Sequence, residues 1–218
     1  MIKYNPPKNI ALDIIYCDDS LLIINKPSGL LSVPGRGEDK RDCLISRIQS
    51  KYPNALIVHR LDMSTSGLMI VARGKEMERS LSILFQQRKV AKKYIAIVDG
   101  EISAKYGEVD LPIITDWPNR PKQKVDFETG KISRTKYSVL SYDAKANTSR
   151  VVLIPVTGRT HQLRLHMKSI NHAIVGDELY ANKSAIEKAA RLLLHASYVS
   201  FQHPVSGELI EINSLPDF

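Results

Sequence analysis

The sequence predicts an α+β fold, built around a largely antiparallel mixed sheet that is flanked by helices and loops. Three observations lead to this fold class. Runs of strand length that are rich in β-branched or aromatic residues outnumber the helical patterns. Strands and helices do not alternate regularly, as they do in folds with a parallel sheet. Turn residues join neighbouring apolar runs in the manner of hairpins.

Strands are expected to begin near the amino terminus. Residues 14–17 and 21–25 are short apolar runs, and the turn residues 18–20 separate them, which indicates a hairpin. The segment 204–207 (PVSG) turns the chain into residues 208–213 and predicts a second hairpin. Further strands are predicted at residues 68–72, 93–98, 132–142, 150–156 and 198–202.

Two segments carry apolar residues at helical spacing. Leu44, Ile45 and Ile48 recur in this way within residues 42–51. The same pattern extends over residues 75–87, where the apolar positions are Met77, Leu81, Leu84 and Phe85. Both segments are therefore predicted to form amphipathic helices.

Length and charge limit the class of protein. A chain of 218 residues with 43% hydrophobic content can bury a sizeable core, and we interpret residues 1–218 as a single domain. The formal net charge of +8 suggests a polyanionic partner, because Lys and Arg that neutralise phosphates release condensed counterions. A merely solvated basic surface explains the composition equally well.

Cysteine usage and hydropathy point to a soluble protein of the cytoplasm. Cys17 and Cys43 have no closely spaced cysteine partner, so neither a metal site nor a disulfide framework is expected. The amino terminus lacks the apolar core of a signal peptide, and no apolar run reaches membrane-spanning length. A phosphate-binding loop and a dinucleotide fingerprint are also missing from the sequence.

The segment 59–67 (HRLDMSTSG) is the most informative part of the chain. It sets a carboxylate close to a guanidinium in a run that ends in turn residues. If the backbone is extended there, Arg60 and Asp62 point to one face, while His59 and Leu61 point to the other. We interpret Asp62 as a catalytic carboxylate; the alternative is a capping or turn Asp.

This segment resembles the His-Arg-Leu-Asp signature of the RluA-type pseudouridine synthases, which isomerise uridine within RNA. Three further segments resemble other motifs of that family in the family's own order: residues 26–30 (KPSGL), 93–98 (KYIAIV) and 158–166 (GRTHQLRLH). Small departures occur at Ser64, where Ala is common, and at residues 171–173, which read NHA where relatives often read GHP. They affect only the expected local loop geometry.

The resemblance extends over residues 116–125 (DWPNRPKQKV) and is strongest to family members that modify two kinds of RNA. It implies an isomerase that converts uridine to pseudouridine in hairpin loops of 23S rRNA and in the anticodon stem-loop of tRNA. One alternative is a related synthase specific for rRNA, and another is a non-catalytic RNA-binding factor of ribosome assembly. Which uridine is modified is not fixed by the sequence.

The implied reaction detaches uracil from the ribose, turns it and rejoins it through C5, so it needs no cofactor and no metal. RNA is the expected partner, without a membrane or a small-molecule cofactor, and we expect a monomer. Larger relatives carry a small S4-like RNA-binding domain before the catalytic domain. Only a short segment precedes the first predicted strand here, so we expect no such domain.

The resemblance implies three catalytic residues. Asp62 is expected to stabilise positive charge on the sugar, to trap the sugar covalently or to remove a sugar proton, and these three roles stay open. Arg164 is implied as the basic partner that keeps Asp62 charged, on a helix that we expect Thr160 to cap. Tyr94 is expected to stack on uracil or to help remove the C5 proton; the alternative is a core Tyr, sharing one strand face with Ala96 and Val98.

Several residues are assigned to RNA contact. Arg60 is expected to fill the space left by the extruded base, or else only to pair with a phosphate or an acidic side chain. We group His59 with Arg60 and interpret its ring as a hydrogen-bonded support. Trp117 is expected either to stack on a loop base or to anchor its loop to the core. The remaining assigned cations are Lys93, Arg120, Lys122 and Arg159.

Overall fold

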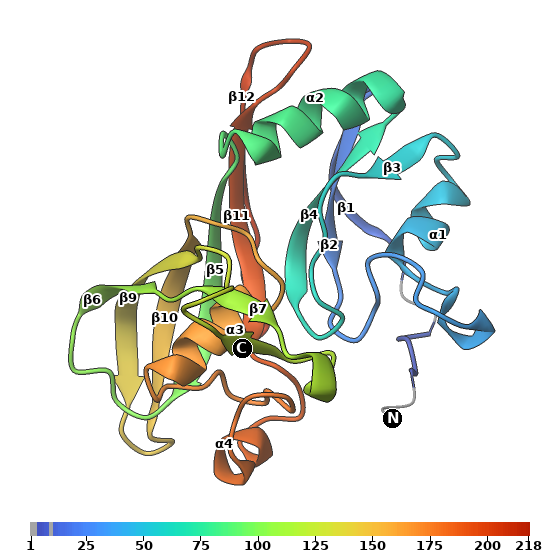
Figure 1. Ribbon diagram of the computed structural model, residues 1–218. Helices are drawn as coiled ribbons and strands as arrows, with labels where there is room; N and C mark the ends of the chain where they lie inside the picture. Colours follow the sequence, from blue (N-terminus) through green and yellow to red (C-terminus); the bar gives the residue numbers. More distant parts are fainter. Residues whose placement is uncertain (1–3, 9–10) are drawn as a thin grey trace. The chain divides into compact units, whose positions relative to one another are not determined.

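The computed structural model describes residues 4–8 and 11–218 and comprises two compact units (Figure 1). The first unit runs to Lys92 and also includes His195–Asp217, and the second consists of Lys93–Leu194 with Phe218. Strands dominate both units and most of their pairings are antiparallel, which confirms the predicted α+β class. The assignment of residues 1–218 to a single domain stays a prediction.

The sheet of the first unit contains both predicted hairpins. Its strands are β1 (Asp13–Cys17), β2 (Leu21–Lys26), β3 (Ala55–Ile57), β4 (Ser66–Arg73), β11 (Leu194–Gln202) and β12 (Leu209–Asn213). β1, β2 and β4 are antiparallel neighbours, and β3 pairs with β4. β11 runs parallel to β4 and antiparallel to β12. Gly67 is required at the parallel contact, because a Cβ there would lie 2.4 Å from the carbonyl oxygen of Ala196.

The core of the first unit lies against strands β2 and β4. Both strands are buried almost along their whole length, which explains why they read as continuous apolar runs. The predicted helices are confirmed as α1 (Leu44–Gln49) and α2 (Lys75–Gln86). Met77 and Leu81 of α2 belong to one buried cluster with apolar residues of β2, β4, β11 and β12.

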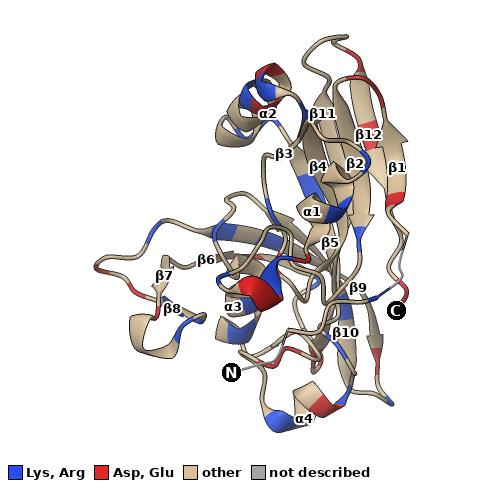
Figure 2. Cartoon of the chain, turned by 90° about the vertical axis from the view of Figure 1, so that its right-hand side faces the viewer, with Lys and Arg blue, Asp and Glu red and all other residues tan. Residues whose placement is uncertain are grey.

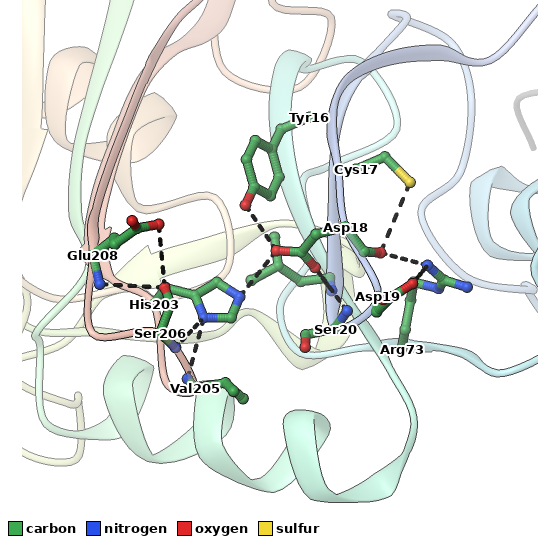
Figure 3. A network of polar contacts seen from close by, with 11 residues as sticks. Tyr16, Cys17, Asp18, Asp19, Ser20, Arg73, His203, Val205, Ser206 and Glu208 are labelled. Carbon is green, nitrogen blue, oxygen red and sulfur yellow. Dashed lines mark hydrogen bonds and ion pairs between the residues drawn. The ribbon is translucent and has the colours of Figure 1, made fainter.

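A polar network joins the two hairpin turns of the first unit (Figure 3). Asp18 accepts a hydrogen bond from the Tyr16 hydroxyl at 2.7 Å. It also accepts hydrogen bonds from two backbone N–H groups of its own turn. Its Oδ2 also lies 3.1 Å from Nε2 of the buried His203, whose Nδ1 accepts two backbone N–H groups of the other turn. The bond to Asp18 raises the pKa of Tyr16 to about 12. Burial raises the pKa of Asp18, but the hydrogen bonds that it accepts outweigh burial and lower it.

The second unit has an antiparallel sheet with strand order β5-β10-β9-β6. Its elements are β5 (Ala91–Asp99), β6 (Tyr106–Asp110), β7 (Ile113–Thr115), β8 (Gln123–Val125), β9 (Arg134–Asp143), β10 (Thr148–Pro155), α3 (Gln162–Ser169) and α4 (Lys183–Glu187). β7 and β8 form a separate hairpin, and a 3-10 turn (Trp117–Asn119) lies between them.

Helix α3 supplies the core of the second unit. Leu163 and Met167 pack with buried residues of β5 and β10, among them Ala96 and Val98, and Tyr94 packs against the same cluster. This confirms the predicted alternation along β5, in which these three residues share a face. No helix in the described part of the chain is long and apolar enough to span a membrane.

Candidate active site

Asp62 lies in a loop of the first unit. Residues 58–65 belong to neither a strand nor a helix. The backbone nevertheless buries Leu61 to 6% exposure, whereas Arg60 is exposed and Asp62 is half-buried. The N–H of Thr65 donates to the carbonyl of Asp62 at 3.1 Å and closes a turn just before β4 begins. The loop therefore presents Asp62 directly beside a buried strand.

A second loop, residues 26–32, holds the Asp62 loop in place. Lys26 is fully buried, and its Nζ donates to the carbonyls of Pro27 (2.9 Å), Leu30 (2.8 Å) and Met63 (3.1 Å). One ammonium group thus crosslinks the two loops next to Asp62. We assigned no role to Lys26 from the sequence, although its place in the KPSGL motif was a signal.

Four further hydrogen bonds link the same two loops. The N–H of Gly29 donates to the carbonyl of Met63 at 2.8 Å, and the Ser28 hydroxyl donates to the carbonyl of Ser64 at 2.7 Å. The buried Ser32 hydroxyl donates to the carbonyl of Leu61 at 2.7 Å and accepts the N–H of the same residue at 3.2 Å. Two motifs that are far apart in the sequence therefore fix the backbone on both sides of Asp62.

Burial controls the charge of Lys26. Desolvation lowers the pKa of its ammonium group to about 7, and the charge of Asp62 partly opposes this shift. An unfolded lysine has a pKa of about 10.4. Between these two values the unfolded chain binds more protons at this residue than the folded chain does.

This difference predicts that Lys26 makes the protein more stable as pH rises from about 7 to about 10. The free energy of unfolding of the wild type, minus that of Lys26→Met, should increase by up to about 1.4 kcal/mol per pH unit in this window. Urea unfolding of both proteins at several pH values measures the slope. A difference that is constant or falls with pH contradicts the prediction.

His59 is packed on the first unit. Its Nε2 accepts the backbone N–H of Ile70 at 2.9 Å, and its ring lies 4.5 Å from that of Phe85. Burial, with a smaller contribution from the charge of Lys92, lowers the pKa of His59 to about 3, so the ring is neutral at physiological pH. These contacts fit the supporting role expected for the ring, and its contact with RNA stays a prediction.

Arg164 lies on α3 in the second unit and forms a buried ion pair. Its Nε and Nη2 donate to the two carboxylate oxygens of Asp177 at 2.8 and 2.7 Å, with 5% and 0% of the two side chains exposed. Such a two-pronged pair fixes the plane of the guanidinium group. Asp177 also accepts the backbone N–H groups of Leu179 and Tyr180, so it orders the turn that follows.

The predicted cap of α3 is wrong. The residue that precedes the helix is His161, not Thr160, and it has a left-handed φ of 55° and no side-chain cap. The buried Gln162 side chain satisfies the polar groups of this turn instead: it accepts from Thr157 Oγ1 and Arg159 N. Because the helix begins at Gln162 and His161 is the capping position, Thr160 lies one residue outside it.

Tyr180 connects Arg164 to the loop between β7 and β8. Its ring centroid lies 5.3 Å from the Arg164 guanidinium carbon. Its hydroxyl accepts the backbone N–H of Gln123 at 2.7 Å and is hydrogen-bonded to His161 Nδ1 at 2.8 Å. We did not single out Asp177 or Tyr180 from the sequence, because neither belongs to a recognised segment and only the fold brings them to Arg164.

The other assigned residues of the second unit lie on its strands and loops. Tyr94 is half-buried on β5, and Lys93 is exposed beside it. Trp117 is 65% exposed, which excludes the alternative that it anchors its loop to the core, and the Arg120 guanidinium lies 4.5 Å from its ring centroid. Lys122 is half-buried and Arg159 is exposed.

Basic side chains also occur beyond the assigned residues. Lys and Arg lie along α2 and at α3, and they are mixed with acidic residues on α2 (Figure 2). Across residues 4–8 and 11–218, no group of three or more His, Cys, Asp or Glu side chains has the arrangement of a metal site.

Comparison with known proteins identifies close relatives. Residues 20–169 match the family described as RNA pseudouridylate synthase. The dual-specificity RNA pseudouridine synthase RluA of Escherichia coli (strain K12) is 52% identical over 218 residues, which cover 100% of this chain and 99% of the relative. The protein of the same name from Vibrio parahaemolyticus is 50% identical over 221 residues, covering 100% of this chain and 88% of the relative.

Solved structures agree with the sequence relatives. Human RNA pseudouridylate synthase domain-containing protein 1 superposes with a TM-score of 0.81 at 30% identity, over 98% of this chain and 87% of the other. Human RNA pseudouridylate synthase domain-containing protein 4 gives a TM-score of 0.74 at 25% identity, over 94% of this chain and 89% of the other.

Proposed function

We propose, because this chain belongs to the RNA pseudouridylate synthase family, that it converts uridine to pseudouridine in hairpin loops of 23S rRNA and in the anticodon stem-loop of tRNA. The observation that carries the proposal is the 52% identity over the full length of a relative named for dual specificity. The reaction is an isomerisation, in which the bond from ribose C1′ to N1 breaks and a bond from C1′ to C5 forms.

Asp62 is the proposed catalytic carboxylate. Breaking the bond to N1 develops positive charge on the sugar, and a fixed carboxylate stabilises that charge or traps the sugar. The hydrogen bonds from Lys26, Ser28, Gly29 and Ser32 support this role, because they restrain the backbone on both sides of Asp62. A restrained carboxylate loses little order as the reaction proceeds.

Arg60, Tyr94 and Arg164 have proposed roles that follow from their chemistry. Arg60 lies two residues before Asp62 and is exposed. Its planar guanidinium group suits stacking in the space left by an extruded base. Tyr94 offers a ring for stacking on uracil and a hydroxyl for the C5 proton. Arg164 offers a positive charge, held in a fixed plane by Asp177, that favours an ionised carboxylate.

We also propose that the protein works in the cytoplasm, as a monomer, with RNA as its partner. The isomerisation imports no atoms and no electrons, so its chemistry requires neither a cofactor nor a metal. His59, Lys93, Trp117, Arg120, Lys122 and Arg159 are proposed to contact the RNA. For Trp117, the exposed ring beside a cation supports stacking on a loop base.

Release of tritium tests the proposed function directly. Uridine that carries tritium at C5 is placed in transcripts of 23S rRNA and of tRNA, and the purified protein is added without any cofactor. We expect release from both RNAs, because C5 loses its hydrogen when the new bond to C1′ forms. Release from rRNA alone would identify the narrower synthase. Tight binding without release from either RNA would identify a non-catalytic RNA-binding factor.

A further inference from the structure

The loop between β7 and β8 projects an aromatic residue and cations from a fixed base in the second unit. We call Asp116–Gln123 the arm. It follows Thr115 and ends at Gln123, which pairs with Thr115, and the N–H of Asp116 donates to the carbonyl of Lys122 at 3.0 Å, which closes it. At its tip Trp117 is 65% exposed and is stacked with Arg120.

One side chain ties the base of the arm to the cluster around Arg164. The Tyr180 hydroxyl accepts the N–H of Gln123, the last residue of the arm, at 2.7 Å. The same hydroxyl is hydrogen-bonded to His161, which immediately precedes α3. The backbone of Tyr180 is also held, because its N–H donates to the Asp177 carboxylate at 3.2 Å.

The two ends of the Tyr180 side chain make different contacts. Its hydroxyl contacts the arm, whereas its ring contacts the guanidinium of Arg164, whose plane Asp177 fixes. Removal of the hydroxyl therefore deletes its hydrogen bonds to Gln123 and His161 and retains the ring beside Arg164. Removal of the whole ring also removes a neighbour of Arg164.

We propose that Tyr180 is a positioning residue that fixes the arm relative to Arg164, so that RNA contacts made by Trp117 and Arg120 depend on the Tyr180 hydroxyl. This inference rests on the proposed function for its substrate, and it adds a residue that acts through the arm. A fixed arm binds RNA more tightly than a mobile one, because less order is lost on binding. Stacking on Trp117 then costs little additional entropy.

A double-mutant cycle on RNA affinity tests the coupling. Trp117→Ala is expected to raise the Kd for a tRNA anticodon stem-loop about tenfold in the wild type, as is usual for loss of one stacked base. Tyr180→Phe should raise it about fivefold by releasing the arm. In the Tyr180→Phe background, Trp117→Ala should then cost about twofold or less, because the arm no longer holds the ring in place.

Kinetics distinguish positioning from a general loss of structure. Tyr180→Phe should change mainly KM, whereas Tyr180→Leu should lower kcat as well, because it also removes the ring beside Arg164. Tyr142→Phe is the matched control: it removes a phenol hydroxyl that bonds only the nearby Asn147 among the hydrogen bonds described for it. This control should leave KM and kcat unchanged, and melting temperatures verify that all variants are folded.

Two outcomes would overturn the inference. One is an equal effect of Trp117→Ala in both backgrounds, which means that the arm does not depend on Tyr180. The other is an unchanged Kd for Trp117→Ala in the wild type, which means that the arm does not stack on RNA. The proposed function is tested separately, since wild-type tritium release does not depend on either result.

Discussion

Asp62→Asn is expected to reduce turnover by at least about a thousandfold, which corresponds to ~4 kcal/mol of lost transition-state stabilisation. The substitution keeps the size of the side chain and removes its charge, so every role considered for the carboxylate is lost. The loop around it should persist, because the hydrogen bonds from Lys26, Ser28 and Ser32 go to backbone atoms of Leu61, Met63 and Ser64.

The measurement compares single-turnover tritium release with RNA affinity. The Kd of Asp62→Asn for the same RNA should stay within about threefold of the wild type, because a neutral amide replaces one carboxylate among many contacts. Asp19→Asn is the matched control, since it makes the same chemical change at a fully exposed side chain of the same unit. Release by Asp62→Asn at a rate near that of the control would remove Asp62 from catalysis.

Asp177→Asn is expected to destabilise the protein by about 3 kcal/mol. The ion pair with Arg164 is nearly inaccessible to solvent, so water cannot replace the lost charge. The Asn side chain retains a carbonyl oxygen for the backbone N–H groups of Leu179 and Tyr180. The decrease in the free energy of unfolding therefore results mainly from removal of the charge that faces the Arg164 guanidinium.

Urea unfolding measures this effect against an exposed ion pair. Asp110→Asn removes one of the two acidic partners of Arg134, the other being Glu108. Close to half of the Arg134 and Asp110 side chains is exposed, so the loss should cost at most about 1 kcal/mol. Turnover of Asp177→Asn should also fall, because Arg164 loses the partner that fixes its plane. Equal stabilities of the two variants would show that the buried pair contributes no more than a surface pair.

Much of the fold follows from local patterns. The period of two along a strand predicted that Tyr94, Ala96 and Val98 share one face of β5, because successive side chains point to opposite faces. Helical spacing predicted α1 and α2, because residues three and four positions apart share one face of a helix. The strands β3, β6, β7 and β8 and the helix α4 were not predicted. They have only three to five residues each.

The sequence by itself identified Asp62 and the motif around it, since chemistry and spacing within a short segment are visible along the chain. Only the tertiary structure decided what surrounds that motif. The bonds from Lys26 and Ser32 to the Asp62 loop join residues 37 and 29 positions apart in sequence. Likewise, the contact of Tyr180 with Gln123 joins residues that no local period relates.

The physical reason is that periodicity specifies which face of an element is apolar, but not which distant polar group will satisfy a buried donor or acceptor. That choice is made when the chain closes, because each buried polar atom needs a partner within hydrogen-bond distance. Lys26 bonds to backbone carbonyls, which every residue possesses, so its partners leave no trace in the sequence. The pairing of Arg164 with Asp177 was fixed in the same way, by the folding of α3 and the turn after it.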